Sequence, residues 1–178
     1  MKTRMSFIGA TVALTALAGV LYAQQNATTT ALADSDKSYL MEDAAGSVYD
    51  FQTAELAVEA AHDSAVQSYA LRLLDDHAKM NKELLLLARR NDIIVPVTLA
   101  DDDKTKLMTL EQQHGADFDR AYIAEAIRIN SDDVEKANKE LNATTDPDIR
   151  KTVGLFLKTE QKHLNDARAL QAKMTASK

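Results

Sequence analysis

Residues 145–174 read TDPDIRKTVGLFLKTEQKHLNDARALQAKM, and this stretch carries the clearest signal of the fold. Pro147 suits the first position of a helix, because that position leaves its amide group without a partner and proline has no amide hydrogen. Steps of three and four residues from there select one mostly apolar stripe: Ile149, Val153, Phe156, Glu160, His163, Ala167, Leu170 and Met174. The stretch therefore predicts a long helix that buries one face against other helices.

Three segments upstream show the same spacing, over residues 36–61, 64–91 and 98–142, and Gly115 is expected to bend the third. Their stripes are Met41, Ala44, Val48, Phe51, Glu55, Val58 and His62; Val66, Ala70, Leu73, His77, Met80, Leu84 and Leu87; and Ile123, Ile127, Asn130, Val134, Ala137 and Leu141. The connectors are short, which favours antiparallel neighbours. The sequence thus predicts an all-α fold, an antiparallel four-helix bundle.

The N-terminus is typical of an exported protein. Lys2 and Arg4 precede an uncharged apolar run at residues 7–21, and the small Ala23 offers a cleavage site. The run is shorter than the roughly 20 residues that a membrane-spanning helix needs, so a single membrane anchor is the weaker alternative. We expect a signal peptide at residues 1–23, a flexible tether at 24–35 and one bundle domain at 36–176, located in the periplasm or cell envelope.

Composition excludes several classes of function. Removal of the leader would change the net charge from −6 to −8, and an acidic domain without a basic stripe is a poor nucleic-acid binder. The chain has no cysteine, so it has neither a disulfide nor a thiol nucleophile. No phosphate-binding loop or serine nucleophile elbow occurs. We therefore expect a mature chain without a transmembrane segment, more suited to binding than to catalysis, with an unidentified partner in the envelope.

Polar residues interrupt each apolar stripe: Glu55 on the first, His77 on the second, Asn130 on the third, and Glu160 with His163 on the fourth. A buried polar group without a partner costs about 1–3 kcal/mol. Several such groups in one core are therefore expected to satisfy one another or to bind an ion.

Helix heights indicate which of these residues can meet. If both interhelical turns lie at the same end, His77 and Asn130 lie roughly 21 Å along their helices and Glu160 roughly 24 Å, at about 1.5 Å per residue. Glu55 lies too low, at roughly 12 Å, whereas Asp50 reaches roughly 20 Å. The predicted layer comprises Asp50, His77, Asn130, Glu160 and His163.

This layer has three interpretations. Two histidines, two carboxylates and an amide are plausible ligands for a transition metal such as Fe, Mn or Zn. Alternatively, the same residues form a structural polar layer, in which His77 hydrogen-bonds Asp50 or Asn130 and His163 pairs with Glu160. A small ligand in a core cavity is the third interpretation. The Glu-x-x-His pattern of Glu160 and His163 occurs only once, and a full di-iron centre needs more carboxylates than these stripes contain.

The chain resembles the bacterial domain-of-unknown-function family 4142. The resemblance rests on residues 66–87 with Asp76-His77, on Phe118-Asp119-Arg120-Ala121-Tyr122-Ile123, and on residues 163–167, and it covers roughly residues 38–170. Members look like exported ferritin-like bundles, often labelled outer-membrane proteins, without a demonstrated activity. The resemblance therefore implies the fold and export but no reaction.

The resemblance also bears on individual residues. It places the family's inward histidines of the second and fourth helices at His77 and His163, and its first-helix glutamate at Asp50. The third-helix histidine falls on Asn130, a departure that weakens any metal site, because an amide binds transition metals less well than imidazole. Two functions are thus expected: a non-catalytic, stress-related envelope protein that binds a partner, or a ferritin-like metalloprotein that stores metal or performs oxygen or peroxide chemistry.

Overall fold

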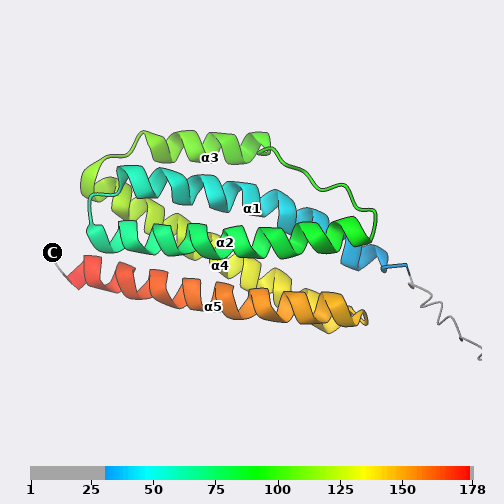
Figure 1. The fold of residues 1–178 in the computed structure, drawn as a ribbon. Coiled ribbons are helices and arrows are strands. Elements are labelled where there is room, and N and C mark those ends of the chain that lie inside the picture. The colour runs from blue at the N-terminus through cyan, green and yellow to red at the C-terminus, as the bar shows by residue number, and fades with distance from the viewer. Residues whose placement is uncertain (1–30, 177–178) are drawn as a thin grey trace, which may run out of the picture. The chain divides into compact units, whose positions relative to one another are not determined.

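The computed structural model describes residues 31–176 as five α-helices (Figure 1). They are α1 (Asp34–Ala60), α2 (Ser64–Arg90), α3 (Asp101–Glu111), α4 (Gly115–Ala143) and α5 (Pro147–Ala176). No strand occurs in this range, which confirms the all-α prediction. None of these helices is long and apolar enough to cross a membrane. The predicted signal peptide and most of the predicted tether lie outside the described residues.

The prediction of a single helix over residues 98–142 is wrong. The chain breaks between α3 and α4, and Gly115 stands at the break with a φ of +57°. That left-handed conformation is cheap only for glycine, so the chain changes direction here instead of bending within one helix. The N-terminal segment of the predicted helix becomes α3, a separate short helix.

The four long helices lie side by side, and α3 lies outside them against α1 and α4 (Figure 1). Each long helix packs against two others: α1 against α2 and α4, and α5 against α2 and α4. These neighbours are antiparallel, whereas α2 and α4 run in the same direction, because the connector and α3 carry the chain back along the molecule.

The two interhelical turns consequently lie at opposite ends, which corrects the assumption behind the predicted heights. Asp119, near the start of α4, accepts hydrogen bonds from the backbone of the α1–α2 turn. At the other end, Arg90 of α2 lies 4.0 Å from Asp148 of α5. The predicted layer nevertheless persists, because His77, Asn130 and Glu160 lie near the middle of their helices, and reversing a helix leaves its middle in place.

The core consists of two apolar clusters. One lies toward the α1–α2 turn and includes Val66, Tyr69, Phe118, Tyr122 and Ile123. The other lies toward the opposite end and includes Leu40, Leu84, Ile149, Val153 and Phe156. The polar residues His77, Asn130, Glu160 and His163 belong to neither cluster, although all are buried, so they separate the two.

The predicted stripes of α2 and α5 are buried as expected except at Met80, Leu170 and Met174, which are half-buried. Of the predicted α1 stripe, only Ala44 is buried. Met41 is 42% exposed and Glu55 is exposed. The buried face of α1 instead includes Leu40, Asp50 and Ala54. This helix contacts α2, α4 and α3. Because it has three neighbours, its buried face is broader than the predicted stripe and includes Asp50.

Asp119 provides a testable contribution to this fold. Asp119 is buried, and each of its two carboxylate oxygens accepts a hydrogen bond from a backbone amide. The donors are the amide nitrogens of His62 and Asp63, each at 2.9 Å. Asp119→Ala is expected to lower the free energy of unfolding by about 2–3 kcal/mol, because both amides lose a charged acceptor. Urea denaturation measures this, with the exposed Asp117→Ala as control; equal small effects would contradict the assigned role.

Candidate metal centre

The polar layer brings three of the predicted residues into one compact group. Among the described residues, His77 of α2 and Glu160 and His163 of α5 form a set in which one donor atom from each lies within 4.8 Å of the others. All three residues are at least 95% buried. Three donors of metal-binding type therefore converge between α2 and α5, at the boundary of the two apolar clusters.

His163 lies between two carboxylates. Its Nε2 is 3.0 Å from Oδ2 of Asp76, and its Nδ1 is 3.6 Å from Oε2 of Glu160. The first distance is a hydrogen bond, and the second is too long for one. Nδ1 of His163 and Oε2 of Glu160 are therefore both buried without a hydrogen-bond partner.

His77 is suited to donate a lone pair. Its ring lies beside that of His163, with the ring centroids 5.6 Å apart and the ring planes tilted by 43°. Burial lowers the pKa of His77, which keeps the imidazole neutral near pH 7. Burial also opposes protonation of His163, but the adjacent carboxylates of Glu160 and Asp76 outweigh it and raise the pKa of His163. A bound cation would compete with that proton.

The geometry fits a single transition-metal ion. Ligand atoms about 2.0–2.2 Å from one ion lie roughly 3–4 Å apart. The 3.6 Å between His163 Nδ1 and Glu160 Oε2 is in this range, and the wider separations in the set, up to 4.8 Å, need a contraction of about 1 Å. Asp76 supplies the outer carboxylate that often orients a metal-binding histidine, because its bond to Nε2 leaves Nδ1 free.

Asn130 lies in the same layer, but its side-chain amide is engaged in hydrogen bonds outside the three-donor group. Its Nδ2 donates to the carbonyl of Ala126 at 2.6 Å and lies 3.4 Å from the hydroxyl of Tyr69. That hydroxyl donates in turn to the backbone carbonyl of His163. Asn130 therefore supports α5 through Tyr69, while its Oδ1 remains without a partner.

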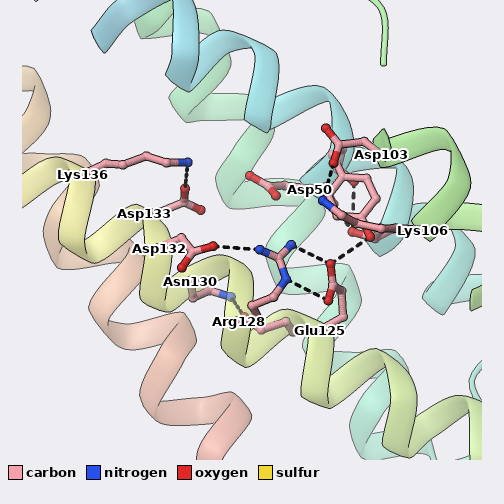
Figure 2. A network of polar contacts seen from close by, with 12 residues as sticks. Asp50, Asp103, Lys106, Glu125, Arg128, Asn130, Asp132, Asp133 and Lys136 are labelled. Atoms are coloured by element: carbon pink, nitrogen blue, oxygen red, sulfur yellow. Dashed lines mark hydrogen bonds and ion pairs between the residues drawn. The ribbon is translucent and has the colours of Figure 1, made fainter. Parts of the chain in front are cut away.

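Asp50 is buried as predicted, but it is not part of the three-residue group. Burial, followed by the charges of Asp133 and Glu160, raises the pKa of Asp50 well above its usual range. Figure 2 shows Asp50 reaching from α1 toward Asp133 and Lys136 of α4. Lys136 Nζ lies 3.2 Å from Asp133 Oδ1. Asp50 thus belongs to an acidic group on the α1–α4 side of the layer.

Sequence reasoning missed Asp76 and Asp133. Asp76 flanks the apolar stripe of α2, and its side chain is one-third exposed. It is therefore not among the polar residues that interrupt the predicted stripes. Its position directly before His77 was the available signal. Asp133 lies three residues after Asn130 and hence on a neighbouring part of the same helix face.

These features accompany a clear family assignment. The chain belongs to the domain-of-unknown-function family DUF4142, whose sequence pattern matches residues 21–170. None of the curated proteins compared with the chain matches it.

Two solved structures have a similar fold. One is the crystal structure of a DUF305 fragment from Deinococcus radiodurans, with a TM-score of 0.73 and 10% identity over 81% of this chain and 99% of that one. The other is CopM in the Cu(I)-bound form, with a TM-score of 0.67 and 16% identity over 78% of this chain and 96% of that one. At these identities the likeness concerns the fold alone.

Proposed function

We propose that this chain is an exported, ferritin-like four-helix-bundle protein of the cell envelope that binds one divalent transition-metal ion between α2 and α5. One observation carries the proposal. Two buried donors without hydrogen-bond partners, Nδ1 of His163 and Oε2 of Glu160, lie 3.6 Å apart, and His77 completes the group within 4.8 Å. Unpartnered buried polar atoms are costly, and a shared cation removes that cost.

The residues have distinct roles in this proposal. His77 and His163 supply imidazole nitrogens, Glu160 supplies a negative oxygen, and Asp76 holds the proton of His163 on Nε2. Imidazole suits Zn, Cu, Fe and Ni, while a carboxylate also accepts Mn. The name of the CopM structure makes copper one ion to test. The apolar clusters on both sides favour holding an ion over converting a substrate.

A structural polar layer is the second candidate. The raised pKa of His163 favours it, because a protonated imidazole between Asp76 and Glu160 would satisfy both carboxylates without metal. In that case the layer fixes the alignment of α2 and α5. The two candidates differ in what added metal does to stability.

A titration of metal-stripped protein, residues 24–178, separates the candidates. At about 100 times the dissociation constant, an ion that binds only the folded state stabilises it by about 2.7 kcal/mol. For a chain of this size the melting temperature should rise by about 5–10 °C with Zn²⁺, Cu²⁺, Fe²⁺ or Mn²⁺. Elemental analysis should find close to one ion per chain. If no ion shifts the melting temperature or remains bound, the polar layer is structural.

A further inference from the structure

Acidic residues recur inside the α1–α4 seam at a spacing of seven residues. Asp43 and Asp50 are seven apart on α1. Seven residues are close to two helical turns, so both lie on one face of α1. The hydrogen bond from Tyr49 Oη to Glu125 Oε1, 2.9 Å long, fixes the alignment of the antiparallel helices α1 and α4. This alignment places Asp133 of α4 within about half a turn of Asp43.

We call Asp43, Asp133 and Asp50 the acidic stripe. Its outer residues, Asp43 and Asp133, are half-buried, whereas Asp50 is 7% exposed. No hydrogen bond engages the Asp50 carboxylate within residues 31–176, and Figure 2 shows that carboxylate between α1 and the Asp133–Lys136 pair. Exposure therefore decreases along the stripe from Asp43 and Asp133 to Asp50, which lies roughly 10 Å from Asp43 along α1.

The inner end of the stripe lies within electrostatic range of the candidate metal centre. Asp133 and Glu160 are the charged groups that act most strongly on Asp50. Glu160 is 4% exposed and its Oε2 has no hydrogen-bond partner. The residue whose charge acts on Asp50 from α5 therefore carries an unpartnered carboxylate oxygen and contributes to the three-donor group.

The stripe is electrostatically costly if it serves only as structure. Burial and the neighbouring carboxylates raise the pKa of Asp43 to about 7 and that of Asp133 to about 6. Lys136 is the cation that lowers the pKa values of both, and its side chain is 42% exposed at the outer end. Apolar residues would pack this seam more stably, so the carboxylates call for another explanation.

We propose that the acidic stripe is the route by which a divalent cation reaches the His77–Glu160–His163 centre, an inference that rests on the proposed function. The cation first meets Asp43 and Asp133, where it competes with Lys136 and with bound protons. Asp50 then offers oxygen ligands inside the core, and Glu160 takes the ion at the inner end. Carboxylate oxygens suit this transfer, because they bind divalent cations without a strict geometry.

Loading kinetics test the route. Stopped-flow mixing of metal-free protein with Co²⁺, followed by cobalt absorbance, gives the loading rate, and a chelator chase gives the release rate. The double variant Asp43→Asn/Asp133→Asn is expected to load and release at least tenfold more slowly, with the equilibrium affinity changed less than about threefold. A route affects both rates together, whereas a ligand mainly affects release and affinity.

Two further variants sharpen the result. Glu59→Gln/Asp132→Asn removes the same net charge from exposed positions of α1 and α4 and should load at the wild-type rate. Lys136→Gln removes the competing cation and should load faster. Folding is not at risk in the double variant, since it relieves repulsion between carboxylates, and a melting temperature at or above that of the wild type verifies this.

The outcomes separate the two proposals. If the wild-type chain binds no Co²⁺, Zn²⁺ or other tested ion, both the centre and the route are wrong. If the wild-type chain binds an ion and the Asp43→Asn/Asp133→Asn variant loads like the exposed control, only the route is wrong. Slower loading of that variant together with faster loading of Lys136→Gln supports the route.

Discussion

Replacing His163 by alanine is expected to lower the affinity for a divalent transition metal at least about hundredfold, or roughly 2.7 kcal/mol. The substitution removes the Nδ1 donor that lies 3.6 Å from Glu160 and leaves two donors, too few to hold an ion firmly. Isothermal titration with the ion that stabilises the wild type measures the change. His163→Gln provides a second variant of similar polarity in case the alanine variant folds poorly.

His62→Ala is the matched control for this prediction. His62 is exposed beyond the C-terminus of α1 and lies outside the three-donor group, so its loss should change the affinity less than about threefold. Equal losses in the two variants would mean that the ion binds elsewhere. An unchanged affinity of the His163→Ala variant would show that His163 is not a ligand of the ion.

The metal-free protein is expected to be more stable at pH 5 than at pH 8, by several kcal/mol. Burial and neighbouring acids raise the pKa of Asp43 to about 7 and that of Asp133 to about 6. The same causes raise the pKa of Glu140, a buried residue of α4 beside Asp36, to about 7. Their pKa values in the unfolded chain are near 4. Between the pKa values of the unfolded and folded states, folding is accompanied by proton uptake. The protonated acids therefore contribute to stability at low pH, and this contribution to the free energy of unfolding is lost as the pH rises through 6–7.

Other groups near these acids set the limits of the effect. Lys136 lowers the pKa of Asp43, while the charge of Glu160 raises it. His77 acts in the opposite direction, because its lowered pKa makes folding less favourable below about pH 6.5. The increase in stability should therefore level off below about pH 5.

Urea denaturation at pH 5, 6, 7 and 8 checks this prediction. Asp43→Asn should reduce the slope of stability against pH, because an amide takes up no proton. The exposed Asp132→Asn should leave the slope unchanged. Stability that rises from pH 5 to pH 8 in the wild type would show that the buried acids are ionised throughout.

The sequence predicted the buried faces of those helices that pack against two long helices. Most residues of the α2 and α5 stripes are buried as expected, because each of these helices packs against two long helices only. The stripe of α1 is wrong because α3 adds a third neighbour. The direction of α4 relative to α2 also escaped prediction, because it depends on a break at Gly115 whose left-handed backbone has no unique sequence signature.

The residues of the candidate centre that follow from spacing along one helix could be predicted from the sequence. Glu160 and His163 are three residues apart on one helix, and His77 lies in the middle of a regular stripe. The roles of Asp76 and the acidic stripe depend on contacts between helices that are distant in the chain. Such contacts follow from the packing of α1 on α4 and of α2 on α5, which periodicity along one helix does not contain.

The path of the chain through α3 divides the long helices into two hairpins, α1–α2 and α4–α5, each closed by a short turn. His77 belongs to the first hairpin, whereas Glu160 and His163 belong to the second. Neither hairpin alone holds the three donors. An ion bound there would join the two halves of the protein, so its affinity would include the free energy of docking one hairpin onto the other.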